Sequence, residues 1–160
     1  MNSLDTYLPA YEFSTLHELT VDAPPEVAER ALREVTFAEV PVVRVLLFAR
    51  GIRAHRSDEP VVAAMVPRAT VVEDRPGEGI VLSLTGQFWR LRGRGPESPA
   101  QAVVDFRSTP GRLTTETRVH VPDPVSRRKF ERYWRVIRPF SGIIRKEILG
   151  AAKRRAEATR

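Results

Sequence analysis

The chain ends in DPVSRRKFERYWRVIRPFSGIIRKEILGAAKRRAEATR, residues 123–160, and this stretch decides the fold. Aspartate is a favourable N-cap and proline a favourable first residue, so we expect a long helix to begin at Asp123-Pro124. At about 100° per residue, one stripe collects the large apolar side chains: Phe130, Tyr133, Trp134, Ile137, Ile144 and Ile148. The basic side chains are expected mainly on the opposite side: Arg127, Arg128, Arg132, Arg135, Arg138, Arg145, Lys146 and Lys153. Pro139 removes one backbone hydrogen bond and predicts a kink. This helix therefore has one apolar stripe to bury against another layer.

Alternation of apolar and polar residues predicts strands before this helix. In residues 11–21, for example, Tyr11 and Phe13 begin an apolar face and charged residues occupy the other. The expected strands are residues 11–21, 61–66, 69–73, 80–85, 86–92, 102–107 and 113–121. Short turns such as Pro110-Gly111 join consecutive strands, which favours an antiparallel meander.

Two short helices are expected between the first strand and the rest of the sheet. Pro24-Pro25-Glu26 is a typical helix start, and apolar residues then recur at helical spacing over residues 28–35. A second helix is expected from Pro41 to a stop at Gly51, although its β-branched start leaves a strand open. We therefore expect one α+β domain over residues 1–160. In it, a curved antiparallel sheet of about six to seven strands wraps around the long C-terminal helix.

The charge of the chain is divided unevenly along its length. The 160 residues hold 26 basic and 20 acidic side chains, a net charge of +6. Residues 1–126 hold 14 basic and 17 acidic side chains, a net −3, whereas residues 127–160 hold 12 and 3, a net +9. Because 23 of the basic residues are arginine, coding bias weakens any argument from arginine at a single site. We expect the C-terminal charge to form the solvated outer face of the long helix, with weak attraction to an anionic membrane surface as the alternative.

Composition excludes several classes of protein and site. The chain has no cysteine, which excludes disulfides, thiolate chemistry and cysteine-ligated zinc. Residues 1–13 contain no lysine, arginine or apolar run, so no signal peptide is expected. The longest apolar runs, 45–49 and 61–66, are far shorter than the roughly 20 residues of a membrane-spanning helix. We expect a soluble, cytoplasmic monomer or homodimer.

Three stretches carry a resemblance to a known superfamily. They are VDAPPEV (21–27), EDRPG (73–77) through GQFWR (86–90), and LTTETRV (113–119) followed by RRKF (127–130) and YWRVIRP (133–139). With the order of elements, they resemble the START-like, or SRPBCC, superfamily and its helix-grip fold. The last set is similar to a group of uncharacterised bacterial SRPBCC proteins. The resemblance covers most of the chain and implies a deep apolar cavity between the sheet and the C-terminal helix. It implies no single chemistry, because the superfamily includes lipid carriers, hormone receptors, polyketide aromatase/cyclases and chaperone activators.

The inward faces of the expected strands would line such a cavity. The candidate ligand-binding residues are Thr15, His17, Trp89, Phe106, Thr115, Thr117, Tyr133 and Trp134. An apolar pocket with a few convergent polar groups is the usual form of a small-molecule site. Each candidate also has a structural interpretation: His17 as a core histidine, the threonines as strand formers, and the aromatic side chains as plain core. If Trp89, Phe106 and Trp134 fill the space themselves, no cavity remains.

Three functions fit these features, and we favour the first: binding or transport of a small hydrophobic molecule. The second is a polyketide cyclase/aromatase- or dehydratase-like enzyme with His17 as proton carrier, since no acidic residue falls on the expected inner faces. The third is binding of an anionic surface through the basic helix. Specific nucleic-acid binding is not expected, because the aromatic residues lie on the buried stripe and offer no stacking platform.

No metal, cofactor or catalytic residue is expected. His17, His55 and His120 lie far apart in the sequence, and His17 and His120 are expected on opposite faces of the sheet. The chain also contains neither a phosphate-binding loop nor a nucleophile elbow.

Overall fold

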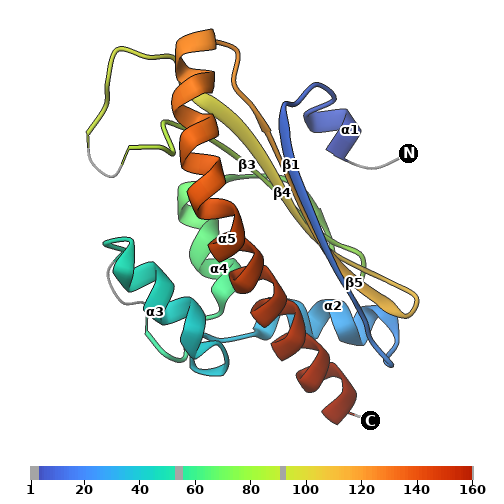
Figure 1. Ribbon diagram of the computed structural model, residues 1–160. Helices are drawn as coiled ribbons and strands as arrows, with labels where there is room; N and C mark the ends of the chain where they lie inside the picture. Colours follow the sequence, from blue (N-terminus) through green and yellow to red (C-terminus); the bar gives the residue numbers. More distant parts are fainter. Residues whose placement is uncertain (1–3, 53–55, 91–92, 160) are drawn as a thin grey trace.

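The computed structural model describes residues 4–52, 56–90 and 93–159. In this part of the chain, a curved five-stranded sheet has the order β1-β5-β4-β3-β2, and every neighbouring pair is antiparallel. The strands are β1 (Phe13–Thr20), β2 (Thr70–Arg75), β3 (Gly79–Gly86), β4 (Ala100–Thr109) and β5 (Arg112–His120). The 35-residue helix α5 (Pro124–Ala158) runs across one face of the sheet (Figure 1). The α+β arrangement expected from the sequence is therefore present and is consistent with a helix grip.

Strand β1 shows how the sequence pattern sets the two faces of the sheet. Its residues alternate between half-buried and exposed from Phe13 to Thr20, as the period of two predicts. In the register with β5, Thr15 pairs with Thr117 and His17 pairs with Thr115. These polar residues therefore stand next to each other on the face that α5 covers.

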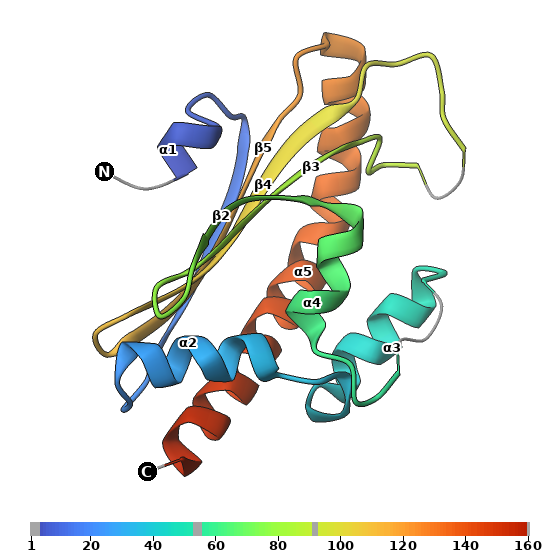
Figure 2. The ribbon, with the colours of Figure 1, turned by 180° about the vertical axis from the view of Figure 1, so that it is seen from behind.

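The smaller helices lie on both sides of the sheet. They are α1 (Leu4–Tyr7), α2 (Pro25–Glu34), α3 (Pro41–Ala49) and α4 (Val61–Met65), with short 3₁₀ helices η1 (Phe37–Glu39) and η2 (Val66–Arg68). Helices α2, α3 and α4 are on the same side as α5 (Figure 2). Helix α1 covers the opposite face, where Leu4 and Leu8 pack with Val81 and Val103. The main core lies between α2, α4, α5 and the inner face of the sheet.

Two of the seven expected strands are absent from the described residues, so the expected count of six to seven was too high. Residues 61–66 form α4 and the start of η2. A short apolar run does not distinguish a buried strand from a buried helix, and Ala63, Ala64 and Met65 favour the helix. Residues 87–90 form a turn closed by a hydrogen bond from the Arg90 amide to the Gln87 carbonyl, 2.9 Å. The remainder of that expected strand, residues 91–92, lies outside the described residues.

The ambiguous segment after Pro41 is a helix. Pro41 occupies the first turn of α3, and Gly51, with φ +79°, follows its end. A positive φ is unfavourable for residues with a Cβ, so glycine ends the helix at the expected place. Helix α5 continues through Pro139 without interruption. In the described ranges, no helix combines the length and hydropathy needed to cross a lipid bilayer.

Candidate functional site

Two adjoining cavities lie between α3 and α5. The first, the outer groove, has a volume of about 670 Å³ and is walled by the C-terminal half of α3, Trp89 and the segment of α5 from Lys129 to Ile144. The second, the inner cavity, has a volume of about 350 Å³ and reaches α4, Leu84 of β3 and Ile148. Both share the side chains of Leu47, Arg50, Tyr133, Ile137 and Ile144. We call the continuous space the α3–α5 pocket.

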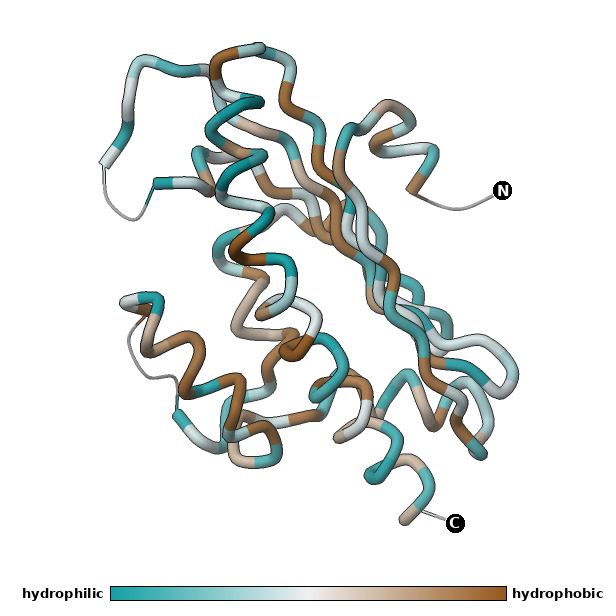
Figure 3. Tube along the Cα trace, in the orientation of Figure 1, coloured by the Kyte–Doolittle hydropathy of each residue, from teal (hydrophilic) through white to brown (hydrophobic). Residues whose placement is uncertain are grey.

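Helix α3 is fixed to α5 at its N-terminal end. The Glu147 carboxylate of α5 accepts hydrogen bonds from the Val43 amide, 3.0 Å, and the Val42 amide, 3.4 Å. These amides belong to the first turn of α3, whose N–H groups have no partner within the helix. Further along, Val45 and Phe48 remain 66% and 74% exposed. Figure 3 shows that α3 is hydrophobic along most of its length although it lies at the edge of the molecule. One end of α3 is thus anchored, and the pocket lies beside the rest.

Arg50 and Tyr133 stand where the outer groove and the inner cavity meet. The Arg50 guanidinium lies 5.0 Å from the centre of the Tyr133 ring and donates a hydrogen bond to the Phe88 carbonyl, 3.2 Å. Burial raises the pKa of the Tyr133 hydroxyl, and the nearby Arg50 charge partly offsets this. Arg50 therefore links α3, α5 and the turn at 87–90, and no carboxylate among the described residues pairs with it.

Arg145 reaches from α5 into the inner cavity. Its Nη1 donates to Thr115 Oγ1 at 3.1 Å, and its guanidinium lies 5.2 Å from the centre of the Phe106 ring. The Thr115 hydroxyl donates a hydrogen bond to the backbone carbonyl of Asp105, 2.7 Å. Its oxygen can therefore accept the hydrogen bond from Arg145. Burial lowers the pKa of Arg145 to about 10, and the charge of Asp105 opposes this. The side chain is therefore positively charged at neutral pH.

A cluster of aromatic side chains packs beside the N-terminal half of α5. Phe130 is 1% exposed and lies at ring-centre distances of 4.8 Å from Phe13, 5.6 Å from Trp134, 5.6 Å from Tyr133 and 6.4 Å from Trp89. Trp134 packs inside this aromatic cluster, as the core interpretation expects. Trp89 and Tyr133 belong to the cluster and also form walls of the α3–α5 pocket. The aromatic side chains thus fill part of the space under the sheet and border the rest.

The other sequence candidates lie next to the pocket rather than in its walls. Phe106 is buried in the core under Arg145. Thr15 and Thr117 form a rung between β1 and β5. His17 is half-buried near Gly142 of α5, and its buried Nε2 has no hydrogen-bond partner among the described residues. Burial, with the charges of Arg145, Lys146 and Arg138, lowers the pKa of His17, so the imidazole is neutral at pH 7.

Sequence reasoning missed the cations of the pocket. Arg145 was expected on the solvent side of the long helix, and the structure places it in the inner cavity. A signal was present, because Arg145 follows Trp134 by 11 residues, or about three turns, and so points in nearly the same direction. Arg127 keeps 42% of its side chain exposed while donating to the Val121 carbonyl at 3.0 Å. Arg50 and Arg68 carried no motif, and only the docking of α3 and α4 brings them to the cavity.

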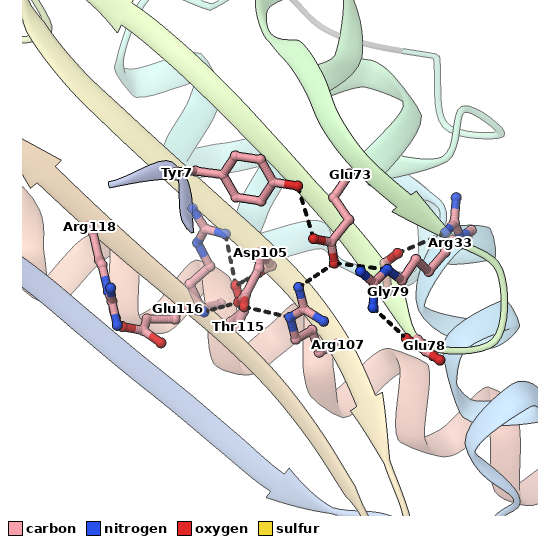
Figure 4. Close-up of polar contacts among 12 residues, drawn as sticks. Tyr7, Arg33, Glu73, Glu78, Gly79, Asp105, Arg107, Thr115, Glu116 and Arg118 are labelled. Atoms are coloured by element: carbon pink, nitrogen blue, oxygen red, sulfur yellow. Dashed lines mark hydrogen bonds and ion pairs between the residues drawn. The ribbon is translucent and has the colours of Figure 1, made fainter. Parts of the chain in front are cut away.

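The opposite face of the sheet holds a second group of charged side chains (Figure 4). Arg107 pairs with Glu73 at 2.8 Å and Asp105 at 3.0 Å, and the Tyr7 hydroxyl donates to Glu73 at 3.0 Å. The Arg107 hydrogen bond, aided by that of Tyr7, lowers the pKa of Glu73, whereas burial raises the pKa of Asp105. The Asp105 carboxylate also accepts from the Glu116 amide at 2.7 Å. These groups satisfy one another and attach α1 to the sheet, so we assign them a structural role.

No three histidine or carboxylate side chains gather closely enough to hold a metal ion in the described ranges. His17 and His120 lie apart, as expected. His120 contacts the Glu12 carboxylate at 3.1 Å, whereas His17 lies near Gly142.

No family model matches the chain, and no curated protein sequence matches it. Solved structures share its general arrangement at low similarity. TTHA0849 from Thermus thermophilus is 13% identical with a TM-score of 0.39, covering 92% of this chain and 99% of that one. Ara h 8.0201 is 13% identical with a TM-score of 0.31, covering 88% and 97%. The di-domain ARO/CYC BexL from the BE-7585A biosynthetic pathway is 15% identical with a TM-score of 0.35, covering 91% of this chain and 50% of that one. Similarity at this level carries no inference about the ligand or reaction of this chain.

Proposed function

We propose that this protein binds a small hydrophobic molecule in the α3–α5 pocket and acts as a carrier or receptor for it. The observation that carries the proposal is the mostly apolar space between α3 and α5, about 670 Å³ in the outer groove and about 350 Å³ in the inner cavity. This space stays open although aromatic side chains pack tightly nearby. Small-molecule sites are typically clefts of roughly 300–1,000 Å³ lined by apolar and aromatic side chains with few polar groups. The sequence resemblance to the START-like superfamily supports the same function.

The rim of the pocket also suits an apolar ligand. Phe48 of α3 and Val136 and Phe140 of α5 are all exposed, and Val136 and Phe140 form part of the outer groove. Large side chains of this kind are usually buried, and adjacent exposed ones mark interaction sites more often than isolated ones do. A hydrophobic ligand entering the groove would cover apolar surface that water now contacts.

The cyclase- or dehydratase-like alternative receives less support. A proton carrier must reach the reacting atoms directly or through one water. Among the described residues, His17 is the histidine on the inner face, but it lies near Gly142 and is not one of the residues that line the pocket. Binding without turnover requires no such group.

Filling the pocket tests the proposal. Leu47 lies in both cavities, so the Leu47→Trp variant should occupy their junction and weaken binding of the uncharged dye Nile red by about tenfold or more, as expected when apolar contact is lost. Leu16→Trp is the matched control, because Leu16 is 59% exposed on the other face of β1. Both variants should retain the wild-type near-UV circular dichroism. Equal dye affinity in wild type and Leu47→Trp would contradict the proposal.

Native mass spectrometry of freshly purified protein provides an independent test. We expect wild-type protein to retain a small molecule that Leu47→Trp does not retain. Its mass and fragmentation would identify the natural ligand.

A further inference from the structure

Among the described residues, the charged side chains that line the α3–α5 pocket are cations, and none is a carboxylate. Its charged wall residues are Arg50, Arg68, Lys129, Arg132 and Arg145. The whole chain has 26 basic and 20 acidic side chains, so an even distribution would place acidic groups among five charged wall positions. An apolar space with charges of one sign is complementary to a molecule that is hydrophobic and carries the opposite charge.

Among the described residues, Arg145 has no oppositely charged partner. Its contacts among the described residues are one hydroxyl and one aromatic ring. A guanidinium has five N–H donors, and Thr115 accepts from only one nitrogen. The nearby Asp105 carboxylate is on the other face of the sheet and is bonded to the Glu116 amide and Arg107. Arg145 is half-buried, and a partly desolvated charge without an opposite charge is unfavourable, so the free protein keeps it at a cost in stability.

Two other arginines with little exposed surface have carboxylate partners. Arg118 is 5% exposed and pairs with Asp5 at 2.6 Å and with Glu116 at 2.7 Å. Arg107 likewise pairs with Glu73 and Asp105. In the part of the chain that the structure describes, no ion pair is found for Arg145. The missing partner thus distinguishes Arg145 of the inner cavity from Arg118 and Arg107.

We propose that the ligand is an amphipathic acid whose carboxylate pairs with Arg145 while its apolar body extends through the outer groove. This inference rests on the proposed function, since it names the chemical class of ligand for the same pocket. Arginine binds a carboxylate through two parallel hydrogen bonds, which suits one desolvated guanidinium and one negative charge. The wider outer groove, with Leu46, Val136 and Phe140 in its walls, accommodates the hydrocarbon.

The test compares ligands that share a ten-carbon chain and differ in the head group: decanoate, 1-decanol and decyl phosphate, measured by displacement of Nile red. Wild-type protein should bind decanoate more tightly than the other two. Arg145→Met should weaken decanoate binding about 10- to 100-fold, the range for losing hydrogen bonds to a charged group, and leave 1-decanol as tight or tighter. Arg135→Met is the matched control. Arg135 is on the same helix, is exposed and pairs with Glu131, so its loss should change decanoate affinity by less than about twofold.

If Arg145→Met does not fold, a second variant still tests the proposal. Arg145→Lys keeps the charge and loses the planar fork, so decanoate should weaken several-fold while 1-decanol does not. Equal losses for decanoate and 1-decanol in either variant would overturn the proposed role of Arg145 and leave hydrophobic binding intact. Tighter binding of decyl phosphate than of decanoate would overturn the carboxylate assignment. If wild-type protein bound neither the dye nor any ten-carbon ligand, the proposed function itself would fail.

Discussion

Two stretches of α5 are packed differently. Around Phe130, aromatic side chains from β1, α5 and the turn at 87–90 meet at 4.8–6.4 Å and fill the space. Around Ile144, aliphatic side chains of α3 and α5 face each other across the α3–α5 pocket. The same helix thus contacts packed aromatic rings at the first stretch and borders open space at the second.

Charges also differ between two regions, the outer face of the sheet and the α3–α5 pocket. On the outer face, Arg118 and Arg107 have carboxylate partners. In the pocket, Lys129 pairs with Glu97, whereas Arg50 and Arg145 contact aromatic rings, a carbonyl and a hydroxyl. A partly buried charge without an opposite charge is unfavourable, so two of them among the described pocket residues indicate a functional requirement there.

The same substitution at two positions of α5, Phe130 and Phe140, gives the largest expected difference between these stretches. Phe130→Ala should lower the free energy of unfolding by about 3–5 kcal/mol, because it opens a cavity inside packed aromatic rings. Phe140→Ala should lower it by less than about 1 kcal/mol, because Phe140 is 44% exposed and borders the outer groove. Urea denaturation followed by circular dichroism measures both. Similar losses at the two positions would show that the groove end is packed as tightly as the aromatic cluster.

The sequence predicted the elements that local chemistry determines. Asp123 caps α5 by accepting from the Ser126 amide at 3.0 Å, and β1 alternates as its period of two requires. The aromatic stripe beginning at Phe130 also lies where helical spacing puts it. These features depend on residues close together in the chain.

The pocket depends on long-range packing, and the sequence did not place it. Its outer wall is α3, whose position is set by Glu147, more than 100 residues away along the chain. The five residues Val61–Met65 form a helix, although a short apolar run by itself permits a buried strand equally. Arg145 was grouped with the basic residues expected mainly on the side opposite the apolar stripe, although its helical position lies near that of Trp134.

A smaller effect tests how closely α5 approaches β1 at Gly142. Gly150→Ala should raise the free energy of unfolding by up to about 1 kcal/mol, since alanine favours a helix and the new Cβ would meet only the mobile end of Arg154, at 3.5 Å. Gly142→Ala should gain less, because its Cβ would lie 3.4 Å from Cε1 of His17. An equal gain in both variants, measured by thermal unfolding, would mean that α5 does not approach β1 closely at Gly142.

The smallest expected effect concerns the pKa of His17 and the positive charges of α5 that lower it. Burial and the charges of Arg145, Lys146 and Arg138 lower its pKa in the folded protein. The unfolded chain therefore takes up a proton first, and His17 should reduce stability as the pH falls below about 6.5, the ordinary histidine pKa. We expect this contribution to stay below about 0.5 kcal/mol, because His17 is partly exposed and screened.

Two variants separate the causes of this shift. His17→Gln should make the loss of stability between pH 7 and pH 5 shallower than in wild type. Lys146→Gln should raise the pKa of His17, read from the pH dependence of its Cε1–H nuclear magnetic resonance signal, because one of the three opposing charges is removed. A His17 signal that titrates at the ordinary pKa in wild type, and does not move in Lys146→Gln, would mean that the cations of α5 do not act on the inner face of the sheet. In that case the positive charges of α5 would not influence the pKa of a side chain on β1.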